Sequence, residues 1–346
     1  MSEVFERKGY HIERLSKKNF EALDKLHNAV YRRPYPPGYF AKKYDTSYTG
    51  VEYIGYLAYN ENGNPIAYYG VIPCFIRYQD QLILAAQSAD AMTHPKYQFK
   101  GLFVQLANLT LDLCAEEGIS LVFGFPNQTS LHTFLVRLKW QMTESMDCYI
   151  VPVSTISTEK MIRKLPFIGR KFKQYQQKIL DKYLVQQKGI ENSVFKDGFG
   201  GVNRNALYMN YKTYHDSYVI RIDKALLWIR IKNNLIIGDM DCQQEDFDEV
   251  MRKLKKLAFR LGLAEIHFHT CHQTRLSTLF AERYEAVPSY YVMFKSLGSH
   301  IPLDRLKFTF ADQDIFLTIS QPILKRRRAG RRPAAVDHNG LPGDMP

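Results

Sequence analysis

Hydrophobic and polar positions in the first half of the chain predict a series of strands and helices. A short strand pattern at 10–13 precedes a helical repeat of Phe20, Leu23, Leu26 and Val30. Three strand patterns separated by polar turns follow at 51–59, 66–77 and 82–93. A helical pattern covers 102–117, and the nearly continuous apolar run at 119–125 is typical of a strand buried on both faces. We therefore predict an α/β fold (α+β mixed sheet) in which antiparallel hairpins precede one β-α-β crossover.

The second half of the chain partly repeats the first. Residues 118–133 align with residues 262–278, and both segments contain a glycine that ends a helix, a strand pattern and a Gln-Thr-x-Leu-x-Thr helix start. An aromatic residue, Trp140 or Tyr284, and another strand pattern follow each copy. We interpret the match as an internal duplication, which predicts two related domains.

Charge is concentrated in two segments. The chain has 346 residues and a formal net charge of +12. Residues 160–189 carry nine basic residues and one acidic residue, and the tail from Lys325 carries six and two, so these segments account for the whole excess. Phe172, Tyr175 and Ile179 lie at helical spacing, which predicts a basic amphipathic helix after a break at 166–169.

These patterns divide the chain into four parts. We expect a first domain at 1–154, a basic helical linker at 155–200, a second related domain at 201–322 and a disordered basic tail at 323–346. No secretory signal or membrane-spanning apolar run is visible, and the five cysteines form no CxxC pair. These features predict a cytoplasmic protein, and the basic helix adds the hypothesis of peripheral association with the inner face of the membrane.

The strand-to-helix connection at 90–103 is the most informative candidate site. It contains Asp90, His94 and Gly101, and the helical pattern begins directly after the glycine. Backbone N–H groups of such a loop point outward at the positive end of a helix, which favours binding of phosphate or pyrophosphate. The alternative is an ordinary strand-to-helix connection without a ligand, because a single glycine before a helix is common.

With the surrounding order of elements, this segment resembles the GNAT superfamily of N-acetyltransferases. Their acetyl-CoA signature is Arg/Gln-x-x-Gly-x-Gly/Ala. Here Gln98 and Gly101 match it, whereas Phe103 stands where glycine or alanine is usual, and Phe99 is bulkier than the common glycine. These departures leave the backbone amides in place and put the close approach of pyrophosphate in question.

The resemblance extends to the organisation of the chain. Met-Thr-His-Pro at 92–95 and Gly-Phe-Pro-Asn at 124–127 look like segments of GNAT enzymes with two such domains. The likeness is close over 10–150 and holds over 205–310 only in element order. It implies tandem GNAT-like acetyltransferase domains joined by the basic helical linker. The second copy lacks the Gln/Arg-x-x-Gly motif, so we expect it not to bind coenzyme A, and either to complete the acceptor pocket or to pack structurally.

The resemblance also implies a mechanism and a set of site residues. Acetyl-CoA would be the co-substrate, and the acyl group would pass directly to a small primary amine within a ternary complex; by likeness, the amine is an amino sugar of surface-polysaccharide synthesis. The strand end at Met92 and Thr93 would hold the pantetheine arm and the thioester carbonyl, and Asn127 and Ser130 would flank the pantetheine. The pyrophosphate would bind the amides of Gln98, Phe99, Lys100, Gly101, Leu102 and Phe103. Asp90 and His94 are the candidates for the general base, and either is alternatively structural.

Two other classes of function stay open. An aminoacyl-tRNA-dependent peptidoglycan ligase also pairs two GNAT-like domains and has a charged helical insert, but such enzymes lack the pyrophosphate loop. A non-catalytic module would dock on anionic lipid through residues 160–189. Nucleic acid is otherwise not an expected partner, because the 23 tyrosines are dispersed rather than interleaved with the basic segments. We expect these tyrosines to lie at the solvated surface.

Histidines and cysteines raise two further hypotheses. His267, His269, Cys271 and His272 lie close together, and His and Cys are zinc ligands. Their spacing matches no usual ligand pattern, and a half-buried strand explains the alternation, so we expect no metal. Cys114 and Cys148 lie in periodic segments and are expected to be core residues rather than nucleophiles.

Overall fold

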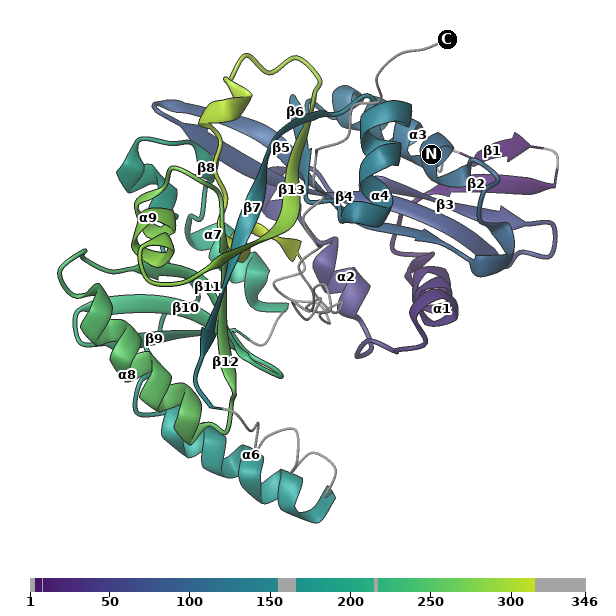
Figure 1. Ribbon diagram of the computed structural model, residues 1–346. Helices are drawn as coiled ribbons and strands as arrows, with labels where there is room; N and C mark the ends of the chain where they lie inside the picture. The colour runs from purple at the N-terminus through teal and green to yellow at the C-terminus, as the bar shows by residue number, and fades with distance from the viewer. Residues whose placement is uncertain (1–3, 8, 155–165, 215–216, 315–346) are drawn as a thin grey trace, which may run out of the picture.

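The computed structural model describes residues 4–7, 9–154, 166–214 and 217–314 (Figure 1). Its strands are β1 (Val4–Arg7), β2 (Tyr10–Arg14), β3 (Gly55–Asn60), β4 (Pro65–Tyr78), β5 (Gln81–Thr93), β6 (Leu121–Gly124), β7 (Gln141–Pro152), β8 (Gly201–Val202), β9 (Tyr218–Ile222), β10 (Ala225–Ile231), β11 (Leu235–Asp241), β12 (Glu265–Thr270) and β13 (Ala286–Ser296). Its α-helices are α1 (Phe20–Tyr31), α2 (Tyr39–Lys43), α3 (Leu102–Glu116), α4 (Gln128–His132), α6 (Pro166–Leu180), α7 (Ala206–Tyr211), α8 (Phe247–Arg260) and α9 (Arg275–Ala281). Short helical turns are η1 (Ser47–Thr49), η2 (Pro95–Tyr97), η3 (Thr133–Arg137), η4 (Ser193–Asp197), η5 (Lys212–Tyr214), η6 (Leu303–Arg305) and η7 (Phe310–Asp312).

One mixed sheet runs through both halves of the molecule. The strand order is β1-β2-β3-β4-β5-β6-β13-β7-β12-β11-β10-β9, with β8 paired to β4. The antiparallel series β2 to β5 and the parallel pair β5 and β6 confirm the predicted hairpins followed by one β-α-β crossover. β3 begins only at Gly55, so the predicted strand at 51–59 was too long at its start.

Helices cover both faces of the first half of the sheet (Figure 1). Leu102, Leu106 and Leu111 of α3 pack with Tyr69 of β4 in one buried cluster. α1 and α2 build a separate cluster in which Leu23 packs with other buried apolar and aromatic side chains. Helix α3 ends where predicted, because Gly118 adopts the left-handed conformation that commonly terminates helices. The first half is therefore a three-layer structure with a different apolar core on each face of the sheet.

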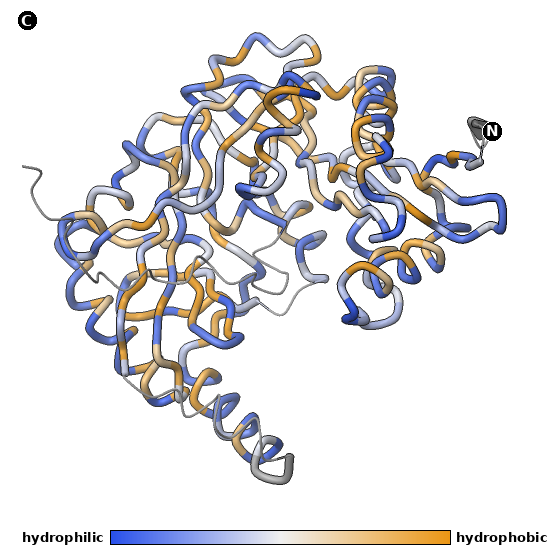
Figure 2. The backbone as a smooth tube through the Cα atoms, turned by 45° about the vertical axis from the view of Figure 1, so that its right-hand side comes forward, coloured by the Kyte–Doolittle hydropathy of each residue, from blue (hydrophilic) through white to orange (hydrophobic). Residues whose placement is uncertain are grey.

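The second half repeats the element order of the first. β10, β11, α8, β12, α9 and β13 follow one another as β4, β5, α3, β6, α4 and β7 do. In each half the pair that flanks the long helix is parallel, as β11 and β12 are. Figure 2 shows hydrophobic and hydrophilic residues alternating along the outer helices of this half, as expected for helices that pack one face on a sheet. The predicted duplication is thus present in the order of the elements.

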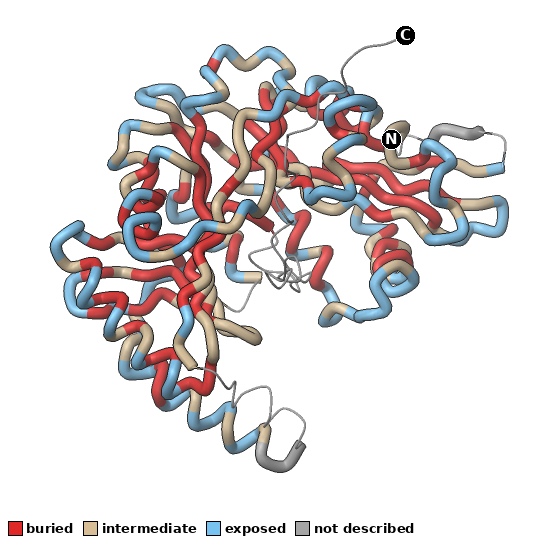
Figure 3. The backbone as a smooth tube through the Cα atoms, viewed as in Figure 1, coloured by how far each residue is buried: buried red, intermediate tan, exposed pale blue. Residues whose placement is uncertain are grey.

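The two halves are interlocked because each places its last strand in the sheet of the other. β13, from the second half, pairs with β6 of the first, and β7, from the first half, pairs with β12 of the second. β13 and β7 also pair with each other, antiparallel, at the centre. Buried and half-buried residues alternate along much of these central strands, and Val292, Met293 and Phe294 of β13 are all buried (Figure 3). The two halves therefore share one hydrogen-bonded sheet.

The segment between the halves differs in part from its prediction. α6 begins at Pro166, so 166–169 is the first turn of the helix rather than a break. Proline suits this position because its missing N–H would have no partner in the first turn of a helix. Ile179 and Leu180 are buried against the second half, and Gln176 donates to the Leu261 carbonyl. The predicted tail, 323–346, lies outside the described residues, and the four domain boundaries stay predictions.

The tyrosines contradict the expected surface location. Many are buried: Tyr39, Tyr44, Tyr56, Tyr59, Tyr68, Tyr69, Tyr149 and Tyr208. Several stack on one another around α2, for example Tyr35 on Tyr39 with ring centroids 3.9 Å apart. Burying tyrosine is favourable because its ring contributes a large apolar surface. Cys114 and Cys148 are buried, as predicted.

Candidate functional site

Two neighbouring strands of the first half separate at the end of their parallel pairing. β5 pairs with β6 only from Ala85–Leu121 to Gln87–Phe123, although β5 continues to Thr93. On its other edge β5 stays paired with β4, interrupted by a bulge that places two residues, Ala89 and Asp90, opposite Gly70. Backbone groups of an antiparallel strand alternate between its two edges. The last residues of β5 thus present N–H and C=O groups on the edge that β6 has left.

The loop after β5 has a backbone that directs amides toward a ligand. Gln98 is extended, with φ −61° and ψ 157°, whereas Phe99 and Gly101 have φ values of 63° and 78°. α3 begins at Leu102, and its first turn ends with the bond from the Gln105 N–H to the Gly101 carbonyl. The first N–H groups of a helix have no partner within it, and they lie at its positive end. This loop is therefore a suitable site for an anion.

Phe99 illustrates why this loop departs from the usual signature without losing its shape. Its φ is in the left-handed region that glycine adopts easily, and its side chain is fully exposed. The bulky ring points away from the protein core, so the backbone keeps the conformation that a glycine would give. Lys100 adds positive charge here, with its ammonium 4.9 Å from the centre of the Tyr97 ring.

His94 holds the turn between the strand and this loop. Its Nδ1 accepts a hydrogen bond from the Lys96 N–H at 3.2 Å, and it caps η2. The Asn60 amide donates to the Tyr97 hydroxyl at 3.0 Å and fixes the same turn to β3. From the sequence we predicted His94 as a candidate base. In the structure, its Nδ1 holds the turn that follows β5 through the bond from Lys96.

Asp90 lies on the opposite face of the sheet from α3, in a network that sequence reasoning missed. Its Oδ2 accepts hydrogen bonds from the Lys43 ammonium at 2.8 Å and the Tyr44 hydroxyl at 2.6 Å. Lys43 is fully buried and also binds Asp314 Oδ2, at 3.0 Å. Burial opposes the charge of Lys43, but Asp90 and Asp314 outweigh it and raise the pKa of Lys43 well above its ordinary value. Both contacts use Oδ2, and among the described residues no hydrogen bond to Oδ1 of Asp90 is present.

A small polar cavity lies next to the point where β5 and β6 separate. It has a volume of about 10 Å³ and is lined by Gln87, Lys212, Asp312 and neighbouring aromatic residues. This space corresponds to about one water molecule. The Gln87 Nε2 atom is buried without a hydrogen-bond partner in the described part of the chain. Burial lowers the pKa of Lys212 to about 8, an effect that Asp314 and Asp312 oppose.

A larger surface hollow, of about 470 Å³, lies elsewhere, between the turn that joins β4 to β5 and the segment around Phe195 and Phe199. Arg77 stacks on the Phe195 ring in this hollow, 3.8 Å from its centre. It contains none of the site residues predicted from the sequence. Size alone therefore does not identify the site, and the separation of β5 from β6 does.

Comparison with known proteins agrees with this geometry. The model of the acetyltransferase (GNAT) domain family matches residues 11–142. This part of the chain is therefore similar to a GNAT domain. It contains β5, β6, the 98–103 loop and Asp90, which are the features described above. No curated protein matches the chain.

Solved structures of proteins described as acetyltransferases or acyltransferases share the fold over most of the chain. A GCN5-related N-acetyltransferase from Anabaena variabilis is 13% identical, has a TM-score of 0.52 and covers 83% of this chain and 73% of its own. A probable N-acyltransferase from Enterococcus faecalis is 10% identical with a TM-score of 0.54, covering 84% and 73%. A putative acetyltransferase from Pyrococcus horikoshii is 11% identical with a TM-score of 0.52, covering 90% and 97%. At these identities the likeness shows the fold, including the second half, and not the substrate.

The remaining predicted residues lie around the GNAT strand ends. Met92 is buried and Thr93 half-buried on β5, opposite Tyr68 and Ala67 of β4. Asn127 caps α4 by accepting hydrogen bonds from the Thr129 and Ser130 N–H groups at 3.0 and 3.1 Å. The exposed Asn127 side chain and the half-buried Ser130 thus belong to the helix start that follows β6.

The corresponding separation in the second half is occupied by the chain itself. β11 pairs with β12 only as far as Ile237–Phe268 and then continues to Asp241. Beyond this point Asp239 accepts hydrogen bonds from the Ser193 N–H and from Arg204, which also binds Asp312. All three charged side chains are buried. This ion network, with the segments that contain Ser193, Arg204 and Asp312, therefore lies at the position that corresponds to the unpaired edge of β5 in the first half.

Two features of the surface complete the description. Among the described residues, no helix is both long and apolar enough to cross a lipid bilayer. Along α6 the basic side chains at 170, 171, 173 and 178 are exposed, while the end of the helix packs on the second half. The binding of α6 to an anionic surface stays a prediction.

Proposed function

We propose that the protein is an acetyl-CoA-dependent N-acyltransferase that moves the acyl group directly to a primary amine. The observation that supports this most is the combination of a free β5 edge with an amide-rich loop at the start of α3. Together they offer hydrogen bonds to an extended pantetheine arm and to a pyrophosphate, which are adjacent parts of one cofactor. The GNAT fold of this region supports acyl transfer in general.

Backbone groups perform the binding steps of this proposal. The amides of 98–103 and the positive end of α3 bind the pyrophosphate. The pantetheine extends along β5 like an additional strand, between Met92 and Thr93 on one side and Asn127 and Ser130 on the other. An N–H group near the bulge hydrogen-bonds the thioester carbonyl, and it stabilises the negative charge that develops there as the amine attacks.

The chemistry then needs one proton acceptor. The amine nitrogen attacks the carbonyl carbon, the C–N bond forms, the C–S bond breaks, and coenzyme A leaves as a thiolate that takes up a proton. Asp90 accepts the proton of the amine through Oδ1, directly or through water, because Lys43 and Tyr44 fix the carboxylate by its other oxygen. His94 is the alternative base through Nε2, since its Nδ1 is engaged by Lys96.

The acceptor enters from the face that carries α1 and α2, opposite α3. Aromatic side chains surround Asp90 here, including Tyr35, Tyr39 and Tyr44. The second half contributes Asp314, which shares Lys43 with Asp90, and this contact supports a role for the second half in forming the acceptor pocket. Aromatic rings and carboxylates suit an ammonium group or a sugar ring, and an amino sugar is the first acceptor that we propose.

Product formation tests the proposal. Purified protein is incubated with acetyl-CoA and a panel of amino sugars and other primary amines, and release of the coenzyme A thiol is followed. We expect thiol release only with an accepted amine, and a higher melting temperature with acetyl-CoA alone. The absence of both a melting shift and heat in a titration with acetyl-CoA would refute the proposal. Charged tRNA and anionic vesicles, tested in parallel, examine the aminoacyl-transfer and membrane alternatives.

A further inference from the structure

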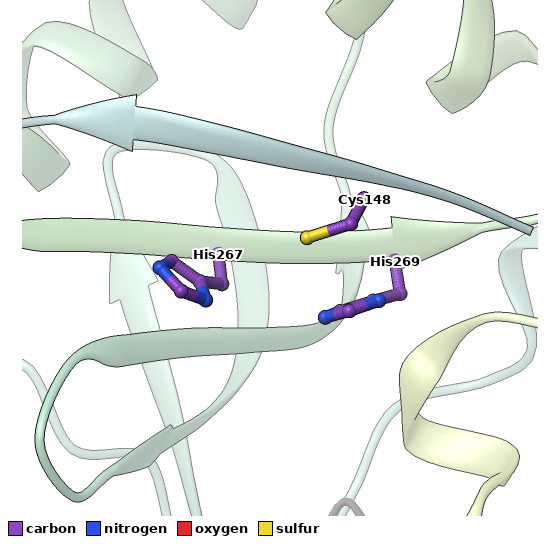
Figure 4. Close-up of side chains that lie close together, drawn as sticks. All are labelled: Cys148, His267 and His269. Atoms are coloured by element: carbon purple, nitrogen blue, oxygen red, sulfur yellow. The ribbon is translucent and has the colours of Figure 1, made fainter. Parts of the chain in front are cut away.

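Three metal-binding side chains meet where the two halves exchange strands. Cys148 lies on β7, and His267 and His269 lie on the neighbouring antiparallel strand β12, with His269 directly opposite Cys148. One donor atom of each residue lies within 4.8 Å of the donor atoms of the other two. Figure 4 shows the sulfur of Cys148 and a ring nitrogen of His269 directed toward the side where His267 lies.

This set differs from the one that the sequence suggested. Cys271 follows the end of β12, and its sulfur accepts a hydrogen bond from the Phe308 N–H. His272 lies beside Asp147 and Glu144, 3.0 and 3.5 Å away. In the structure Cys148 completes the cluster in place of Cys271 and His272. More than a hundred residues of sequence separate Cys148 from the two histidines, and the pairing of β7 with β12 brings them together.

Both imidazoles are oriented by contacts outside the cluster. His267 Nε2 lies 2.8 Å from Glu265 Oε2 and 3.1 Å from the Asn234 amide. His269 Nδ1 lies 3.1 Å from the Ser289 hydroxyl. One nitrogen of each ring is therefore held, and the other is available. Metal-binding histidines typically have this arrangement, with a carboxylate or another polar group on the second nitrogen.

Burial and charge also suit a cation. Cys148 and His269 are buried, so an ion bound between them would be shielded from solvent. The negative charges of Glu265 and Asp147 act on the Cys148 side chain. These two acidic residues would be stabilised by a nearby cation, and the thiol would release its proton to solvent when it binds one.

We propose that Cys148, His267 and His269 bind one Zn²⁺ ion, with a water molecule as the fourth ligand. One sulfur and two imidazole nitrogens are donors that favour zinc over magnesium or calcium. Around a tetrahedral zinc ion, such donors lie about 3.5 Å apart, given bonds of ~2.3 Å to sulfur and ~2.0 Å to nitrogen. The donors would therefore need to approach one another by up to about 1 Å when the ion binds. The ion would cross-link β7, from the first half, to β12 of the second half.

Metal titration of the full-length protein tests the proposal. The protein is stripped with a chelator, and Co²⁺ is added as a spectroscopic probe before displacement by Zn²⁺. We expect one equivalent to bind, with the visible spectrum of tetrahedral Co²⁺ and a sulfur-to-cobalt charge-transfer band. Zn²⁺ should abolish this spectrum and raise the melting temperature by a few degrees.

Variants separate this site from other histidines and cysteines. Cys148→Ser should lose the charge-transfer band, and His267→Gln, whose side chain is only partly buried, should lose tight binding. Cys271→Ser and His272→Gln are matched controls that should bind as the wild type does. Circular dichroism of each variant shows whether it folds.

The proposal is overturned if the folded wild type gives no charge-transfer band, or if folded His267→Gln binds as tightly as the wild type. It is equally overturned if His272→Gln abolishes binding, since the ion would then lie elsewhere.

Discussion

Replacing Lys43 by methionine tests the buried charge network around Asp90. The change keeps an unbranched side chain, shorter by one heavy atom, and removes its charge. Two carboxylates then lose their partner, and their side chains are only 17% and 8% exposed, for Asp90 and Asp314. Removing one partner of a buried ion pair destabilises a protein by about 3–5 kcal/mol. The Lys43 side chain is already fully buried, so methionine adds little new apolar contact and we expect most of this loss to appear.

Urea unfolding at pH 7, followed by circular dichroism, measures the loss. The pH is suitable because the pKa of Lys43 is raised on folding, so its contribution is complete below about pH 10.4 and is lost only as pH rises through its folded pKa. Lys42→Met is the matched control, since Lys42 is the exposed neighbour on the same helix, and should change stability by less than about 0.5 kcal/mol.

Two results would refute this reasoning. One is a Lys43→Met protein as stable as the Lys42→Met control. The other concerns the triple variant with Asp90→Asn and Asp314→Asn, in which no charge is left unpaired. Replacing both partners of a buried contact is milder than removing one. The triple variant should therefore recover part of the loss, and a further decrease in stability would contradict the assigned network.

Three further changes test individual parts of the site. Gly101→Ala should weaken acetyl-CoA binding in a calorimetric titration, whereas Gly63→Ala should not. The two variants are matched, because an added Cβ meets no neighbouring atom at either glycine and both have a positive φ, of 78° and 71°. Both variants therefore carry a similar backbone strain of about 1–2 kcal/mol. Asp90→Asn should lower kcat by about 10²–10⁴-fold with little change in acetyl-CoA affinity, and an unchanged kcat would remove Asp90 as the base. Burial lowers the pKa of Lys212 from 10.5 to about 8, so the unfolded state binds more protons than the folded state between these pH values. The stability of the wild type relative to Lys212→Met should therefore rise with pH across that interval. A difference in stability that does not change with pH would show that the pKa of Lys212 is not lowered.

The sequence predicts the local elements of this fold well because periodicity and turn residues are local signals. The β3–β5 hairpins, α3 and the parallel pair that follows were all expected from such patterns. Alignment of the two Gln-Thr-x-Leu-x-Thr segments also found the repeat. The exchange of β7 and β13 could not be predicted, because both strands have the same apolar pattern whichever sheet neighbour they take.

The backbone part of the candidate site and the position of Asp90 could be predicted from the sequence, but the partners of Asp90 could not. Gly101 and its neighbours are consecutive, so their role follows from a motif. Lys43, Asp90 and Asp314 come from three distant segments, and nothing in the sequence links them. One signal was available, because a tyrosine-rich stretch from Tyr31 to Tyr48 encloses Lys43, and a lysine among so many aromatic residues suggests burial with a charged partner.

Hydrogen–deuterium exchange with and without acetyl-CoA tests the central claim most directly. If the cofactor lies along the free edge of β5 and against the start of α3, amides in peptides covering 88–105 and 125–131 exchange more slowly when it is present. Peptides covering 238–250, the equivalent strand end and helix start of the second half, should be unaffected because the chain's own ion network occupies that position. Protection of 238–250 without protection of 88–105, or no protection at all, would contradict the account.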